Sequence, residues 1–159
     1  MTDHAPMRSP GVRFPPPLLH VAGLVTGWIL ERRVRALPLP GDPDLVSALG
    51  VLLIALGLAL TAWGMLTFRA ARTAIIPMRS ASRLVDHGPY RFTRNPMYTG
   101  FTLIYVGAAA MMDSAWPLLA LPIVLGLLVR LVIEREERYL QDAFGAEYSG
   151  YRARVRRGL

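Results

Sequence analysis

The sequence contains no cysteine, and all 18 of its basic residues are arginine rather than lysine. The absence of cysteine excludes a disulfide framework, a thiolate nucleophile and a cysteine-ligated metal. The three histidines, His4, His20 and His87, are far apart and lack the short spacing of metal ligands, so we expect no metal site. We attribute the absence of lysine mainly to genome composition.

Charge is also absent from long stretches of the chain. Hydrophobic residues make up 53% of the 159 residues, yet the formal net charge is +7. A soluble core cannot bury so much apolar surface in a short chain, because small domains keep a large fraction of their surface exposed. Apolar segments alternate with arginine clusters, which indicates contact with lipid and anionic headgroups rather than with nucleic acid.

Four apolar segments predict an all-α fold, a polytopic membrane helix bundle with about four transmembrane helices. These segments cover residues 18–30, 45–68, 97–112 and 116–133. The second is the clearest span, with no charge in 24 residues, whereas the first is short and follows three prolines. The break "DSAW" between the last two predicts a tight helical hairpin.

The arginines predict the orientation in the membrane. With four spans and both termini in the cytoplasm, 15 arginines lie on the cytoplasmic side and 3 on the other. This asymmetry follows the positive-inside rule. We therefore expect both termini to be cytoplasmic, with the protein in the inner membrane if the host is a bacterium. The polar, proline-rich residues 1–17 predict a flexible N-terminus without a cleaved signal peptide.

The tail that follows residue 133 predicts an amphipathic cytoplasmic helix. Its apolar residues recur at helical spacing: Leu140, Phe144, Tyr148, Tyr151 and Val155. The helix can lie on lipid, or it can cap the cytoplasmic end of the bundle, and the pattern leaves both open. Gly145 is expected to break or bend it.

The stretch "GPYRFTRNPMYTG", residues 88–100, places polar and rigid residues at the start of an apolar segment. Gly88 predicts a turn, and Pro96 suits the first turn of a helix that begins after Asn95. The free N–H groups and positive dipole of that helix start, beside Arg94, suit a carboxylate or phosphate. An ordinary helix start with arginines reaching lipid headgroups explains the pattern equally well.

A second group of charged residues comprises Arg130, Glu134, Glu136 and Glu137. A salt-bridged, solvated helix end is one interpretation. However, the adjacent Glu136 and Glu137 point about 100° apart, so at least one faces the bundle if the tail folds over it. A carboxylate there can hold an ammonium group or a pair of ribose hydroxyls.

Two motifs carry a family resemblance. "LVDHGPYRFTRNPMYTG", followed after an apolar hairpin by "REERYLQDAFGAEYSGYRARV", resembles the isoprenylcysteine carboxyl methyltransferase family and the related membrane phospholipid N-methyltransferases. The resemblance covers residues 82–155. It implies a cofactor-binding catalytic half in residues 82–157 and does not assign the residues before Ser82. The apolar segments place two spans in residues 18–68, and we expect a single integral membrane domain over residues 1–159. The resemblance implies S-adenosylmethionine bound at the cytoplasmic helix ends, and a lipid or lipid-like acceptor.

The resemblance also implies roles for individual residues. Cofactor contacts fall on Ser82, Arg83, Leu84, Val85, Gly88, Tyr90, Asn95, Pro96, Met97, Tyr98 and Glu136. Catalytic or acceptor-facing roles fall on Arg94, Arg130 and Glu137. The isoprenylcysteine enzymes commonly have His where this chain has Asn95. Asn can bind but cannot take up a proton near neutral pH, so we expect a binding role there and not a base.

Several acceptors and two other functions stay open. A carboxylate acceptor needs no base, whereas an amine must lose a proton to a base such as Glu136 or Glu137. The acceptor can be a prenyl-cysteine, a phosphatidylethanolamine, another lipid or a small hydrophobic thiol. Membrane sterol reductases, which use NADPH, resemble the same region but are normally larger. A non-catalytic membrane scaffold that binds anionic lipid is the third possibility.

Overall fold

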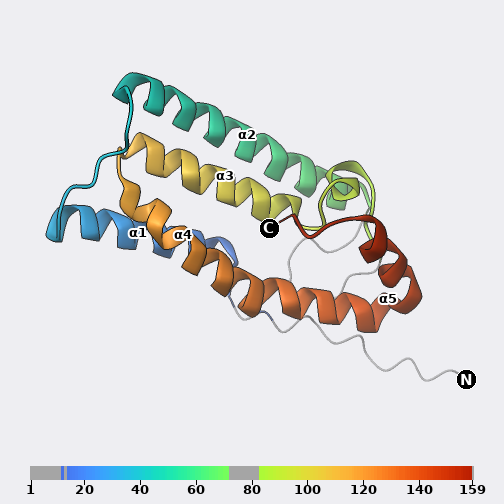
Figure 1. Ribbon diagram of the computed structural model, residues 1–159. Coiled ribbons are helices and arrows are strands. Elements are labelled where there is room, and N and C mark those ends of the chain that lie inside the picture. Colours follow the sequence, from blue (N-terminus) through green and yellow to red (C-terminus); the bar gives the residue numbers. More distant parts are fainter. Residues whose placement is uncertain (1–11, 13, 72–82, 159) are drawn as a thin grey trace, which may run out of the picture.

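The computed structural model describes residue 12, residues 14–71 and residues 83–158, and every regular element in this part of the chain is helical. In chain order the elements are α1 (Pro17–Arg33), α2 (Pro43–Ala70), the 3-10 turn η1 (Gly88–Arg91), α3 (Pro96–Met111), α4 (Ala115–Leu128), the π turn η2 (Val129–Ile133) and α5 (Glu134–Arg154). Figure 1 shows α1 to α4 forming a bundle, with α5 continuing from α4 at one end. The all-α prediction is confirmed for the described residues.

Proline fixes the start of three helices. Pro17, Pro43 and Pro96 stand in the first turn of α1, α2 and α3, where the missing N–H has no partner to lose. At α2 the Asp42 carboxylate also accepts a hydrogen bond from the Leu45 N–H, at 3.0 Å. The predicted starts of the apolar segments therefore agree with the helix starts to within about two residues.

Glycines bring α2 and α3 into close contact. A Cβ atom on Gly57 would lie 2.5 Å from the Gly100 carbonyl oxygen, and one on Gly50 would lie 2.8 Å from the Gly107 carbonyl oxygen. Gly64, a further seven residues along α2, meets the side chain of Met97. Small residues at helix interfaces allow this approach in lipid, where burying apolar side chains gains nothing. The contact fixes the start of α3 against the end of α2.

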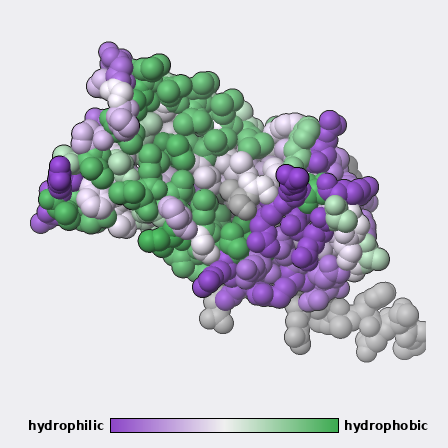
Figure 2. Space-filling view, in the orientation of Figure 1, coloured by the Kyte–Doolittle hydropathy of each residue, from purple (hydrophilic) through white to green (hydrophobic). Residues whose placement is uncertain are grey.

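The outer surface of the bundle is apolar. Leu52, Leu58 and Ile123 are 52%, 56% and 68% exposed. Figure 2 shows hydrophobic residues over most of the bundle and hydrophilic residues gathered at the end that carries α5. Among the described residues, two helices are long and apolar enough to cross a membrane, Pro43–Ala70 and the continuous helix Ala115–Arg154. The other two predicted spans correspond to α1 and α3, which have 17 and 16 residues.

The helix α5 continues the last apolar helix, α4, without an intervening loop. The π turn Val129–Ile133 joins α4 directly to α5. At Gly145, with φ of 51°, the chain bends as predicted. The apolar stripe of the tail packs within the protein, with Tyr148 and Tyr151 buried against Leu84. This contact favours a cap on the bundle over a helix lying on lipid.

The opposite end of the bundle has the predicted hairpin. Residues 112–114 join α3 to α4, and the buried Ser114 hydroxyl donates a hydrogen bond to Glu31 at 2.6 Å. The Asp113 carboxylate accepts one from the Leu39 N–H at 3.0 Å. These contacts tie the loop after α1 to the α3–α4 turn.

Candidate functional site

The turn η1 lies between the end of α2 and the bent tail. Gly88 has φ of +61°, and a Cβ atom there would lie 2.8 Å from the Thr67 hydroxyl oxygen, so glycine is required for conformation and for space. The buried ring of Tyr90 packs edge-on against Phe68, with centroids 5.0 Å apart. The Tyr90 carbonyl accepts a hydrogen bond from the Tyr151 hydroxyl at 2.8 Å. The predicted turn is confirmed.

The Tyr90 hydroxyl is buried without a hydrogen-bond partner. Burial, with smaller contributions from Tyr151 and Glu136, raises its pKa above the usual range of tyrosine. The hydroxyl therefore stays neutral and remains a donor at physiological pH. A buried unpaired hydroxyl is unfavourable by roughly 1–3 kcal/mol, and such groups are rare without a reason. Within the described residues the Tyr90 hydroxyl is therefore a donor whose hydrogen-bonding capacity is unused.

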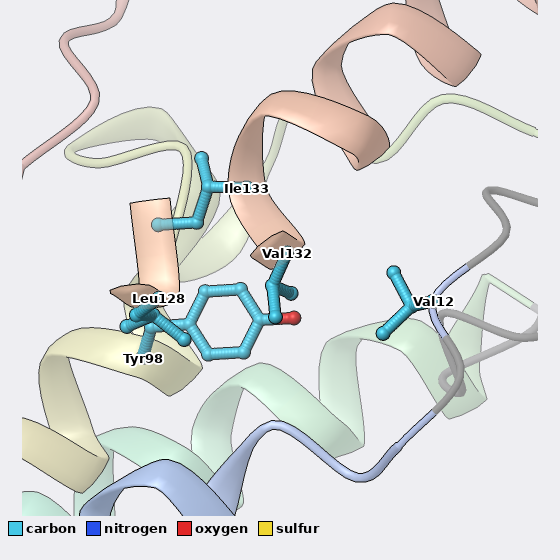
Figure 3. Packing of buried hydrophobic residues seen from close by; sticks show 5 residues of the cluster. All are labelled: Val12, Tyr98, Leu128, Val132 and Ile133. Atoms are coloured by element: carbon cyan, nitrogen blue, oxygen red, sulfur yellow. The ribbon is translucent and has the colours of Figure 1, made fainter. Parts of the chain in front are cut away.

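Tyr98 and Glu136 form a hydrogen-bonded pair, and the charge of Glu136 acts on Tyr90. Tyr98, in the first turn of α3, donates to the Glu136 carboxylate at 2.6 Å. Figure 3 shows the Tyr98 ring among Leu128, Val132 and Ile133, three apolar residues with no exposed surface. Burial raises the pKa of Glu136 to about 7, the hydrogen bond from Tyr98 acts in the opposite direction, and the charge of Glu137 adds to the rise. Glu136 therefore changes charge near neutral pH.

Glu137 lies between two arginines, and we call Arg94, Glu137 and Arg157 the charged triad. Its Oε1 atom is 3.1 Å from Arg94 Nη1 and 3.1 Å from Arg157 Nε. Its Oε2 atom is 2.6 Å from Arg157 Nη2. The side chains of Arg94 and Glu137 are 11% and 12% exposed. The triad carries a formal charge of +1, and both oxygens of Glu137 are engaged.

One edge of the Arg94 guanidinium has no hydrogen-bond partner among the described residues. Nη1 contacts Glu137 and also lies 3.4 Å from the Tyr148 hydroxyl. Nε is buried without a partner, and no hydrogen bond from Nη2 occurs within the described part of the chain. Nε and Nη2 are the pair of donors that Arg157 directs at Glu137. The corresponding fork on Arg94 can take a second carboxylate or a phosphate.

The chain's own C-terminal residues cover the start of α3. The Arg94 N–H donates to the Arg156 carbonyl at 3.0 Å, and the Thr93 hydroxyl and the Asn95 amide donate to the Arg157 carbonyl at 2.9 and 3.0 Å. The Asn95 side chain does not cap α3. The residues just before α3 therefore bind a segment of the chain itself, and the Arg94 side chain beside them has a buried donor, Nε, without a partner.

The other predicted site residues are spread over several parts of the structure. Val85 is buried, Leu84 packs against the tail, and Met97 lies against Gly64. Arg83 and Arg130 are exposed, and no hydrogen bond or ion pair between described residues joins Arg130 to the triad. Ser82 lies outside the described residues.

Sequence reasoning missed Arg157, and it recognised Tyr148 and Tyr151 only as part of an apolar stripe. Both tyrosines bring hydroxyls to the site, on Arg94 and on the Tyr90 carbonyl respectively. Within the described residues, no group of three or more metal-binding side chains comes together.

Comparisons with known proteins agree with these motifs. A model of the phospholipid methyltransferase family matches residues 45–147. A probable protein-S-isoprenylcysteine O-methyltransferase of Oryza sativa subsp. indica is 30% identical over 135 residues, which cover 82% of this chain and 71% of the rice protein. Protein-S-isoprenylcysteine O-methyltransferase B of Arabidopsis thaliana is 31% identical over 116 residues, covering 72% and 59% of the two chains. No solved structure gives a significant match.

Proposed function

The chain belongs to the phospholipid methyltransferase family, and from that premise we propose that it transfers a methyl group from S-adenosylmethionine to a carboxylate on a lipid-like acceptor. The similar plant proteins are named O-methyltransferases of protein S-isoprenylcysteine. A carboxylate is the acceptor that this name implies. Neither NADPH-dependent reduction nor a non-catalytic scaffold is favoured by these relatives.

The observation that carries the proposal is the unpaired Nε–Nη2 edge of Arg94. A planar carboxylate matches the two parallel donors Nε and Nη2, and burial of Nε strengthens such a bond. The formal charge of +1 on the triad favours an anion at Arg94. The acceptor's apolar chain can stay in lipid beside the exposed apolar residues of the bundle while its carboxylate reaches Arg94.

Tyr90 and Glu136 are the residues best suited to hold the cofactor. An unpaired buried hydroxyl and a carboxylate suit ribose hydroxyls or an ammonium group, both of which S-adenosylmethionine carries. When bound, the cofactor supplies a methyl group already activated on a sulfonium, so no metal and no covalent enzyme intermediate are required. Further cofactor contacts on Ser82 to Val85, Gly88 and Asn95 to Tyr98 remain predictions from the family resemblance.

The proposed reaction requires little acid–base catalysis from the protein. An acceptor carboxylate would form its bond to the methyl carbon with its own lone pair while the bond from that carbon to the sulfonium sulfur breaks and S-adenosylhomocysteine leaves, so no proton would have to leave the acceptor. Arg94 orients the attacking group, and the apolar residues around Tyr98 limit the access of water. Positioning and water exclusion are therefore the main contributions of the chain. We assign Arg94 to the acceptor and leave Arg130 as a prediction only.

A phospholipid amine is the second candidate acceptor, because one side chain can serve as its base. The pKa of Glu136, about 7, suits a group that removes a proton near neutral pH. Glu137, predicted as an alternative base, has both oxygens engaged by arginines and is less available. An amine acceptor would require Glu136 to be unprotonated, so its methylation should rise with pH through about 7.

We also propose the four-span arrangement, with one domain over residues 1–159 and both termini in the cytoplasm. The helices α1 and α3 rise about 1.5 Å per residue and reach about 25 Å, close to the thickness of the hydrocarbon core. The site then lies at the arginine-rich cytoplasmic end, where a soluble cofactor can enter. Reporter fusions that place the C-terminus outside would contradict this arrangement.

The test is methyl transfer by the purified protein in lipid nanodiscs. Labelled S-adenosylmethionine would be supplied with an S-prenylated cysteine that has a free carboxylate, or with phosphatidylethanolamine. We expect a base-labile methyl ester on the first acceptor, and a matched prenylcysteine amide should accept no methyl group. Stable N-methyl product on phosphatidylethanolamine alone would favour the second candidate. Absence of both products, with normal binding of S-adenosylhomocysteine, would argue against both acceptors.

A further inference from the structure

Arg157 is a residue that neither the motifs nor the proposed acceptor contacts include. It follows the end of α5 in a non-helical segment, and its side chain is 32% exposed. Two of its donors nevertheless bind the Glu137 carboxylate: Nε donates to Oε1 at 3.1 Å, and Nη2 donates to Oε2 at 2.6 Å. This bidentate arrangement is the strongest that an arginine and a carboxylate form.

The position of Arg157 is fixed by the segment that carries Arg94. Its carbonyl accepts hydrogen bonds from Thr93 and Asn95, on either side of Arg94. The next residue, Gly158, has φ of +83° and packs against Thr93. Hydrogen bonds from residues 93–95 to the carbonyls of residues 156 and 157 thus hold the two arginines of the triad around one carboxylate.

The unpaired edge of Arg94 depends on this arrangement. Glu137 already touches Arg94 through Oε1, and a carboxylate with a free second oxygen would favour the bidentate fork of Arg94. Arg157 removes that option, because it engages Oε2 and shares Oε1. It also supplies the positive charge that leaves the triad at +1. Without Arg157, Arg94 and Glu137 would form a neutral pair with little attraction for an anion.

We propose that Arg157 is a positioning residue, which holds Glu137 away from the side-on edge of Arg94 and so keeps that edge free for the carboxylate of the acceptor. This role rests on the proposed function, because it presumes that Arg94 binds the acceptor. Arg157 does not itself touch the acceptor or the cofactor. Its effect is on acceptor affinity, through competition between Glu137 and the acceptor for one guanidinium.

The test compares Arg157→Gln with the double variant Arg157→Gln/Glu137→Gln. In Arg157→Gln we expect KM for the prenylcysteine carboxylate to rise about tenfold or more, the size of one lost charged hydrogen bond. The kcat value and the affinity for S-adenosylhomocysteine should stay within about twofold of wild type. The double variant should recover most of the acceptor affinity, because a neutral amide competes poorly for Arg94. Arg156→Gln, at an adjacent and exposed side chain, is the control and should leave KM unchanged.

A purely structural role predicts a different result, in which the double variant is as defective as Arg157→Gln or worse. That outcome would overturn the proposal, and so would an unchanged acceptor KM in Arg157→Gln. Equilibrium binding of the acceptor to protein saturated with S-adenosylhomocysteine gives the same comparison without turnover. A wild-type protein that binds the carboxylate but does not methylate it would contradict the proposed function alone. A wild-type protein that does not bind it would contradict both.

Discussion

Removing the Tyr98 hydroxyl should change the pH at which cofactor binding is lost. The hydroxyl donates to Glu136 at 2.6 Å, and this bond favours the ionised carboxylate. A hydrogen bond to a charged group contributes roughly 1.5–3 kcal/mol, which corresponds to about one to two pKa units. In Tyr98→Phe the pKa of Glu136 should therefore rise from about 7 by about that amount.

The direction of the effect follows from the charge of Glu136. A carboxylate is ionised above its pKa, so wild-type binding of S-adenosylhomocysteine should be complete above pH 7 and weaken as the pH falls through about 7. In Tyr98→Phe the same loss should occur about one to two pH units higher. Calorimetric titrations between about pH 5.5 and pH 9.5, in nanodiscs, would give both profiles.

A matched control is Tyr105→Phe. It also removes a buried tyrosine hydroxyl from α3, but that hydroxyl donates to the Pro117 carbonyl at 2.7 Å, within the bundle. It should lower stability without moving the pH profile. Superimposable profiles for Tyr98→Phe and wild type, or a shift to lower pH, would refute the assignment of Glu136 to the cofactor.

Three further predictions concern other contacts. Arg94→Lys should fold and bind S-adenosylhomocysteine yet lose most methyl transfer, because lysine has no planar fork; turnover within about twofold of wild type would make Arg94 a simple membrane anchor. Tyr90→Phe removes an unpaired hydroxyl, so thermal unfolding should show no loss of stability while cofactor affinity falls. A loss of stability with unchanged cofactor affinity would mean that the hydroxyl stabilises the fold instead. Gly57→Ala should destabilise the protein by about 1–3 kcal/mol, because its Cβ would meet a carbonyl oxygen at 2.5 Å. Gly126→Ala, with open space around it, is the control and should be neutral in the same unfolding assay.

The parts of the fold that sequence could predict are those with local signals. Gly88 marked a turn, Pro96 a helix start and Gly145 a bend, because each residue restricts or permits particular backbone angles regardless of its neighbours. Long apolar runs marked the helices because a backbone surrounded by lipid must satisfy its hydrogen bonds within one segment. The lipid-facing and protein-facing sides of the tail could not be told apart, since a stripe of apolar residues satisfies either environment.

The candidate site was only partly predictable, because its contacts join distant parts of the chain. Tyr98 and Glu136 are 38 residues apart, and Arg94 meets Tyr148 across 54 residues. The family resemblance supplied Arg94, Glu136 and Glu137, but no local pattern distinguishes Arg157 from the arginines beside it. The π turn was also missed, because one extra residue in a helical turn leaves no mark in an apolar run.

The unbroken course of the chain from α4 into α5 has a mechanical consequence. From Ala115 to Glu136 the helix rises about 1.5 Å per residue, or roughly 32 Å, which is close to the thickness of a bilayer's hydrocarbon core. The first backbone break comes only at Gly145. A bilayer thinner than this length makes such a helix tilt, and tilting changes the height of Glu136 relative to the lipid headgroups. The length of the surrounding acyl chains therefore affects the depth at which a soluble cofactor and a lipid-borne acceptor meet.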